Sequence, residues 1–273
     1  MGKKSYGSPY FVWMSIFIIV PMFLVLYYAF TIQTDQGMVF SLDNIKRIAE
    51  PLYIKVFVRS LVLALESTAI CLLIAYPAAM ILADKKFSKS TTFLVMIVLP
   101  MWMNFLLRTY SWLSLLENNG LINKLVISLG FERMQLMYNE GAVVLGMVYN
   151  FLPFMILPIY SVLVKIDNNV IEAARDLGCT SFGVFKKITV PLSLPGVLSG
   201  ITMVFMPAIS TFIISRLLSG GKVSLIGNVI EQQFLVLGDW GFGSALSLVL
   251  MVFILISMAF INKGSSGYEG GIL

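Results

Sequence analysis

Six long apolar stretches constrain the fold of this chain more than any other feature. They cover residues 10–30, 61–83, 91–115, 142–164, 192–214 and 242–261. Each has about 20 residues or more, enough to cross a hydrocarbon core of about 30 Å as a helix. Charged residues make up only 12% of the chain, whereas soluble domains average about 25%. The sequence therefore predicts an all-α membrane protein with six transmembrane helices.

The transmembrane domain is expected to span residues 10–262. A short N-terminal segment, residues 1–9, precedes it, and a Gly- and Ser-rich tail, residues 263–273, is expected to be flexible. Lys3 and Lys4 before the first stretch are also typical of a secretory signal. That stretch is longer than a signal core and no small-residue cleavage pattern follows it, so a retained helix is predicted.

The distribution of basic residues predicts the orientation. Ten lysines and arginines lie in the set formed by residues 1–9, 84–90, 165–190 and 263–273, and eight lie in the longer set formed by the other loops. Cytoplasmic loops carry the excess of Lys and Arg. Both termini and the loop 166–191 are therefore expected on the cytoplasmic side. The same topology accounts for the pI of about 9.1, so no nucleic-acid partner is expected.

The residues needed for catalysis are missing from the sequence. There is no histidine, which removes the commonest general base and metal ligand. Gly220-Gly221-Lys222 is followed by Val223 instead of Ser or Thr, so the phosphate-binding loop of ATPases is absent. The carboxylates are scattered. We expect no catalytic site, no cofactor and no metal site, and we favour a transport or scaffold role.

The loop 166–191 carries the most informative motif. Asn169 and Glu172 have the spacing of a capping box, which predicts a helix beginning there. Gly178 suits the left-handed position that ends a helix. The predicted apolar face of this helix comprises Val170, Ile171, Ala174 and Leu177, with Arg175 and Asp176 directed outward. Thr180 or Ser181 is expected to cap a second short helix that ends at Pro191.

Two interpretations of this helix pair are open from physical chemistry alone. Its phenylalanines and lysines would suit a linker lying on the membrane lipid of the inner leaflet. Alternatively, the pair projects into a groove of a cytoplasmic partner, where Ala173 and Ala174 allow close approach and Glu172 meets polar groups.

The spacing of the motif resembles a known family. Glu-Ala-Ala, three residues, Gly, nine residues, Ile, two residues, Pro is formed by Glu172, Ala173, Ala174, Gly178, Ile188 and Pro191. It resembles the EAA loop of permease subunits of bacterial ABC importers. The resemblance implies the type I importer permease fold, a second homologous permease subunit, and a cytoplasmic ABC ATPase dimer that docks on this loop.

Other segments are similar to the polyamine-importing branch of that family. They are Pro51-Leu52-Tyr53, Pro100 through Tyr110, Leu152 through Met155, Ile226 through Ile230 and Asp239 through Gly243. The similarity implies spermidine or putrescine as cargo, an extracytoplasmic polyamine-binding protein as partner, and the bacterial inner membrane as location.

Glu66 and Arg108 lie inside the second and third stretches at similar predicted depth. A charge deep in a span costs about 2.5–3.5 kcal/mol on insertion scales, so each is expected to face protein or water. Either they form an ion pair that holds two helices together, or Glu66 faces the cargo.

A polyamine is a flexible chain of ammonium groups joined by methylenes, so aromatic faces and carboxylates suit its path. The candidate pathway residues are Trp102, Asn104, Tyr110, Tyr149, Asn150 and Glu66. Trp and Tyr in membrane proteins also form interfacial belts, and that alternative stays open.

The fifth stretch contains Pro195, Gly196, Gly200 and Pro207. The small residues predict close helix packing, and a flexible gate helix is the alternative. For the whole chain, three other functions stay open: an importer of the same class for another solute (amino acid, iron, sulfate or phosphate), a membrane-embedded enzyme, and a structural anchor.

Overall fold

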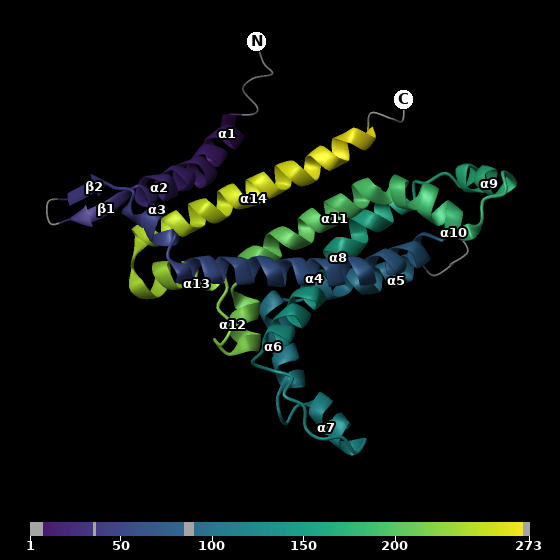
Figure 1. The fold of residues 1–273 in the computed structure, drawn as a ribbon, viewed down its shortest axis with the longest axis horizontal. Helices are drawn as coiled ribbons and strands as arrows, with labels where there is room; N and C mark the ends of the chain where they lie inside the picture. The colour runs from purple at the N-terminus through teal and green to yellow at the C-terminus, as the bar shows by residue number, and fades with distance from the viewer. Residues whose placement is uncertain (1–7, 35–36, 85–89, 270–273) are drawn as a thin grey trace, which may run out of the picture.

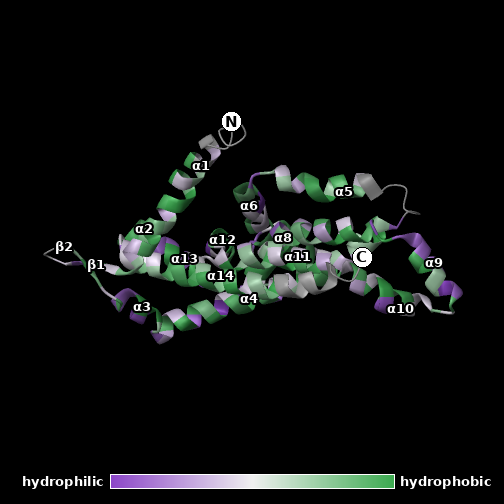
Figure 2. Cartoon of the chain, turned by 90° about the horizontal axis from the view of Figure 1, so that it is seen from above, coloured by the Kyte–Doolittle hydropathy of each residue, from purple (hydrophilic) through white to green (hydrophobic). Residues whose placement is uncertain are grey.

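The computed structural model describes residues 8–34, 37–84 and 90–269. Long helices run side by side along one axis, with a small hairpin at one end and two short helices at the other (Figure 1). Within the described residues, five helices are long and apolar enough to cross a membrane, or six if a pair of helices joined by a sharp bend counts as one span. Hydrophilic residues gather on α9 at one end and around α3 at the other (Figure 2).

Three helices form the centre of the bundle: α4 (Pro51–Ala83), α8 (Glu140–Leu163) and α11 (Val190–Ser210). α8 packs along both of the others and contributes fully buried Met147, Met155 and Ile159 to the core. The Tyr76 and Ser193 hydroxyls are 2.8 Å apart and join α4 to α11. Buried hydroxyls that pair with each other avoid the penalty of an unsatisfied polar group in the membrane.

The first span lies at the edge of this bundle. It consists of α1 (Ser8–Met14), a π-helical turn (Ser15–Ile19) and α2 (Val20–Ala29). α2 packs on α14 (Trp240–Glu269), and only Ala29 of α2 is buried. α14 continues into the tail that was expected to be flexible: it remains helical to Glu269, and residues 270–273 lie outside the described residues.

A two-stranded hairpin adds to the predicted all-α fold. β1 (Thr31–Thr34) pairs antiparallel with β2 (Gly37–Phe40), with Ile32 opposite Val39. α3 (Asp43–Ile48) follows, and the hairpin and α3 lie at the end of the bundle opposite α9 (Figure 1). The prediction missed the hairpin because strands of four residues leave almost no periodicity to detect.

The third span is broken, where a continuous helix was expected. α5 (Ser90–Val98) passes into a 3₁₀ turn (Leu99–Trp102), and α6 (Phe105–Leu116) and α7 (Leu121–Ser128) follow. The two halves meet at 95°. Pro100, which cannot supply a backbone N–H, lies in the 3₁₀ turn. α6 packs against α12 and α8, and α7 projects away from the bundle (Figure 1).

The fifth span begins earlier than predicted. α10 (Ser181–Val184), a π-helical turn (Phe185–Thr189) and α11 form one helical run from Ser181 to Ser210. Pro191 therefore does not end the second short helix. It occupies the first turn of α11, where its missing N–H is tolerated, and the wider π turn precedes it.

After Ser210 the chain folds back in short pieces. These are α12 (Ile213–Ser219), α13 (Ile226–Gln232) and a π-helical turn (Gln233–Leu237). The buried Ser60 hydroxyl of α4 accepts the amide N–H of Ile226 at 2.7 Å. The Arg216 guanidinium and the Glu231 carboxylate are 2.9 Å apart and join α12 to α13.

Candidate functional site

The helix pair predicted in the loop 166–191 is present. α9 (Asn168–Asp176) has Leu177 as its C-cap. Gly178 follows with φ +81°, in the left-handed region predicted for it. The Thr180 hydroxyl accepts the amide N–H of Gly183 at 3.2 Å and so caps α10, as one of the two predicted caps.

The cap of α9 differs from the prediction. Asp167 is the N-cap, and its Oδ1 accepts the amide N–H of Asn169 at 3.0 Å. The capping box proposed for Asn169 and Glu172 is therefore wrong. Asp167, Asn168 and Asn169 occur in succession here, and both residue types cap well, so spacing alone could not choose among the three positions.

The apolar face predicted for α9 is divided in the structure. Ile171 and Ala174 are half-buried, whereas Val170 is exposed and the side chain of Leu177 is 89% exposed. No residue of α9 is fully buried. Apolar side chains therefore point away from the bundle at positions 170, 173 and 177, which share one helical face.

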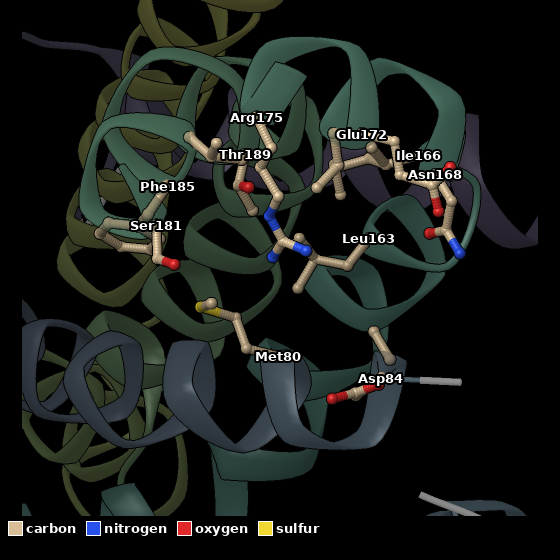
Figure 3. Close-up of a pocket in the computed structure, with 13 residues that line it drawn as sticks. Met80, Asp84, Leu163, Ile166, Asn168, Glu172, Arg175, Ser181, Phe185 and Thr189 are labelled. Carbon is tan, nitrogen blue, oxygen red and sulfur yellow. The ribbon is translucent and has the colours of Figure 1, made fainter. Parts of the chain in front are cut away.

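A cavity of about 600 Å³ lies between the helix pair and the bundle. α4, α8, α9 and the run from α10 into the π turn contribute its walls. Figure 3 shows the guanidinium of Arg175 pointing into this cavity, toward the side where Met80, Leu163 and Ser181 lie. Arg175 and Asp176 were expected to point outward. Both are exposed, but Arg175 also lines the cavity, because α9 turns its Asn168, Glu172 and Arg175 face toward the bundle.

The six motif residues therefore have different environments. Glu172 lines the cavity and is exposed, Ala173 is exposed, and Ala174 is half-buried. Gly178 ends α9, Ile188 is half-buried in the π turn, and Pro191 begins α11. The motif thus builds one exposed, polar projection that is continuous with a membrane-spanning helix.

The candidate pathway residues of the third span lie at its break. Asn104 is the N-cap of α6, and its Oδ1 accepts the amide N–H groups of Leu106 at 2.8 Å and Leu107 at 3.4 Å. The side chain of Trp102 is 86% exposed, and Tyr110 is also exposed. Asn104 therefore has a structural role at the bend that the prediction of a continuous helix could not include.

Glu66 and Arg108 have different surroundings in the structure. Glu66 is exposed on α4, Arg108 is buried on α6, and no ion pair joins them among the residues that the structure describes. Tyr149 packs edge-to-face on Trp112 with ring centroids 5.2 Å apart. Asn150 is fully buried in α8, and its Nδ2 donates to the carbonyl oxygen of Gly146 at 2.9 Å.

Within the part of the chain that the structure describes, His, Cys, Asp and Glu side chains form no group of three that could hold a metal ion. The sequence analysis missed the Arg216–Glu231 pair and a second long-range pair, Arg47–Asp239. The two residues of each pair are too far apart in the sequence to be neighbours on one helix or strand, so no local sequence pattern predicts the pairing.

The comparisons with known proteins agree with the motif. The family model described as "Binding-protein-dependent transport system inner membrane component" matches residues 3–263. The spermidine/putrescine transport system permease protein PotB of Escherichia coli (strain K12) is 38% identical over 245 residues, covering 88% of this chain and 89% of PotB. The protein of the same name from Haemophilus influenzae is 39% identical over 249 residues, covering 89% of this chain and 86% of its own length.

Solved structures agree on the fold. A chain in the crystal structure of a bacterial alginate ABC transporter, bound to an alginate-loaded periplasmic protein, matches with a TM-score of 0.81 at 16% identity. That match covers 96% of this chain and 93% of the other. The resemblance inferred from the EAA motif is therefore confirmed, and the chain belongs to the family of inner membrane components of binding-protein-dependent transport systems.

Proposed function

We propose that this chain is the permease subunit of an ATP-driven importer of polyamines, with spermidine or putrescine as cargo. The observation that carries the proposal is its similarity, along almost the whole chain, to permeases named for spermidine and putrescine transport. The chain forms half of the pathway, and a second homologous permease forms the other half. ATP is hydrolysed by separate subunits.

The coupling site in this proposal is the exposed face of α9. Val170, Ala173 and Leu177 present small and apolar side chains on one face, and Phe182 at the start of α10 is exposed beside them. A short helix with such a face suits a groove on another protein. The ATPase dimer is the partner that would bind it, and the cavity behind α9 leaves space for the helix pair to move against α4 and α8.

The pathway in this proposal runs past the break in the third span. Trp102 and Tyr110 offer aromatic faces to ammonium groups, and Glu66 offers an exposed carboxylate. Tyr149, which packs on Trp112 of α6, is assigned to the same wall. Asn104, which caps α6 and is exposed, stays a candidate for the lining, whereas Asn150 is buried in α8 and supports the wall from behind.

The orientation follows from the same assignment. α9 faces the cytoplasm, where the ATPases lie, and the C-terminal end of α14 points toward the same end of the molecule (Figure 1). Both termini are then cytoplasmic. The hairpin and α3 face the opposite side, where a polyamine-binding protein delivers its cargo.

Uptake of radiolabelled spermidine tests the cargo. Cells lacking this chain and any other polyamine carrier should lose uptake, and the wild-type chain should restore it. Restored uptake of an amino acid, iron, sulfate or phosphate, with no restored spermidine uptake, would show the other cargo and refute the proposal.

Replacing Leu177 by Asp tests the coupling. Surface substitutions usually change stability by less than about 0.5 kcal/mol, so the variant should insert normally while ATPase binding and uptake fall together. Leu177→Met, which keeps an apolar side chain at the same position, is the matched control and should leave uptake unchanged. Normal uptake by the Leu177→Asp variant would contradict a docking role for α9.

A further inference from the structure

Tyr76 of α4 contacts the fifth span at two places. Its hydroxyl oxygen lies 2.8 Å from the hydroxyl oxygen of Ser193, near the start of α11. Its ring packs edge-to-face on the ring of Phe185 in the π turn, with the centroids 6.0 Å apart. One half-buried side chain of α4 is therefore bound both to α11 and to the turn that precedes it.

The direction of the hydrogen bond shows that Ser193 does not depend on Tyr76. The Ser193 hydroxyl donates to the carbonyl oxygen of Val190 at 3.0 Å, within α11 itself. A hydroxyl has a single hydrogen to donate, so Tyr76 is the donor in the pair with Ser193. Removing the Tyr76 hydroxyl would leave the buried Ser193 hydroxyl with its own bond to Val190, and it would break a link between two helices.

A line of aromatic rings leads from the exposed helix pair to Tyr76. Phe182 of α10 is exposed, and its ring centroid lies 6.4 Å from that of Phe185. Phe185 lines the cavity behind α9, as does Met80, one turn beyond Tyr76 on α4 (Figure 3). Aromatic rings with centroids about 4.5–7 Å apart attract each other beyond the effect of their buried area. A displacement of α10 would therefore reach α4 through Phe185 and Tyr76.

The residue after Tyr76 makes this part of α4 deformable. Pro77 lies inside the unbroken α4, and it has no N–H to donate to the carbonyl oxygen of Leu73. Helices kink at such positions more readily than elsewhere. Tyr76 thus attaches α4 to the fifth span at a place where α4 can follow a movement of its neighbour.

We propose that Tyr76 is a positioning residue of the transport cycle, which makes α4 follow the displacement that the ATPases impose on α9 and α10. This inference rests on the proposed function, because it needs an ATPase that docks on the helix pair. Without the Tyr76 hydroxyl, α10 and α11 would move while α4 lags behind, so more ATP would be hydrolysed for each molecule of cargo. A role in packing alone has a different signature, namely a lower thermal stability with an unchanged ratio of ATP hydrolysed to cargo imported.

The full transporter, reconstituted in liposomes, tests the proposal through the ratio of ATP hydrolysed to spermidine imported. Tyr76→Phe keeps the ring and removes the hydroxyl. Its ratio should rise about fivefold, the factor that corresponds to one net hydrogen bond, while the thermal unfolding midpoint and the KM for spermidine stay near the wild-type values. Tyr160→Phe is the matched control, because Tyr160 is half-buried on α8 and its hydroxyl bonds to no residue that the structure describes. An unchanged ratio in Tyr76→Phe, or an equal rise in Tyr160→Phe, would overturn the proposal.

Further variants examine the two contacts of Tyr76 separately. Ser193→Ala removes the acceptor, and adding it to Tyr76→Phe should raise the ratio no further, because both changes break the same bond. Phe185→Leu removes the ring contact and should raise the ratio as well. Phe253→Leu is its control, because it breaks a similar contact of α4, between Phe57 and Phe253 with centroids 5.1 Å apart, on the side of α14. Additive effects of the first two changes, or a wild-type ratio in Phe185→Leu, would refute transmission through Tyr76.

The proposed function and the role of Tyr76 fail in different ways. A wild-type transporter that imports another solute but no spermidine loses the cargo assignment alone, and the variants are then compared with that solute. A wild-type transporter that imports spermidine, with Tyr76 and Phe185 variants that keep its ratio, loses the role of Tyr76 alone.

Discussion

Arg47 and Asp239 lie 192 residues apart in the sequence, yet Nη1 of Arg47 and Oδ2 of Asp239 are 2.9 Å apart. The other carboxylate oxygen of Asp239 accepts the amide N–H of Phe242 at 3.0 Å, in the first turn of α14. The Arg47 guanidinium carbon also lies 4.1 Å from the centroid of the Phe242 ring. One carboxylate therefore orders the start of the last span and fastens it to α3.

Removing this carboxylate should lower the thermal stability of the purified protein. Asp239→Ala loses a helix-capping bond and an ion pair, and the two together contribute about 1–2 kcal/mol. Both side chains are more than a third exposed, so the ion pair contributes the smaller part. Asp239→Asn keeps the capping oxygen and should lose less than about 1 kcal/mol.

Thermal unfolding in detergent measures both variants. Lys46→Ala, which breaks an exposed pair with Asp43 in the same helix as Arg47, is the control and should leave the midpoint unchanged. Equal losses in Asp239→Ala and Asp239→Asn would contradict the capping role.

Gly178→Ala should uncouple the transporter without unfolding it. An alanine at φ +81° is strained by about 1–2 kcal/mol, although its Cβ meets nothing within 4 Å. The strain would change the angle between α9 and α10, so uptake should fall while membrane insertion persists. Gly130→Ala is the matched control, because Gly130 has φ +85° and equally open surroundings but lies beyond α7. Equal effects on uptake from both variants would show a general defect instead.

Gly196→Ala should destabilise the bundle more than Gly200→Ala. A Cβ at Gly196 would lie 2.8 Å from the carbonyl oxygen of Pro158 and 3.1 Å from the Cα of Ile159, so the α8 backbone would have to move. At Gly200 the closest atom is the flexible thioether sulfur of Met155, at 2.7 Å.

Overpacking of this kind costs about 1–3 kcal/mol, and Gly196→Ala should lie near the upper end. The thermal unfolding midpoint of each variant measures the difference, with the exposed Ser199→Ala as control. A larger loss for Gly200→Ala would mean that α8 yields more easily than the Met155 side chain.

Asn104 substitutions separate a structural role from a role in the pathway. Asn104→Ala removes the cap of α6 and should cost about 1 kcal/mol. Asn104→Asp keeps an acceptor for Leu106 and Leu107 and should preserve stability. Spermidine uptake should fall for Asn104→Ala and stay near the wild-type rate for Asn104→Asp. Impaired uptake by a stable Asn104→Asp variant would instead place the amide in contact with cargo.

Much of this architecture could be predicted because lipid imposes a simple rule on composition. Five unbroken spans follow from hydropathy, since each segment must be long and apolar to cross the membrane. The left-handed turn at Gly178 follows from its residue type, because only glycine adopts that conformation readily.

The bend at Asn104 could not be predicted in the same way. Hydropathy does not show whether a helix axis changes direction, and residues 91–115 are apolar on both sides of the bend. Pro100 and Asn104 are residues that end and begin helices, yet proline is common inside membrane helices. Pro153 and Pro158 lie within the unbroken α8.

The orientation of α9 depended on contacts that its own residues do not encode. Arg175 points inward because the ends of α4 and α8 leave a cavity there, so tertiary packing overrides the apparent amphipathic face. Similarly, Glu66 and Arg108 share a predicted depth, yet Glu66 is exposed and Arg108 is buried.

The uninterrupted run from Ser181 to Ser210 has a mechanical consequence. It has 30 residues, and at about 1.5 Å per residue it spans about 45 Å. It joins the cytoplasmic projection to the interior of the membrane by helical backbone and not by a loop. A displacement applied near Ser181 would therefore reach Ser210 along one helix, and the π turn at Phe185–Thr189 and Pro195 are the points at which that helix can bend.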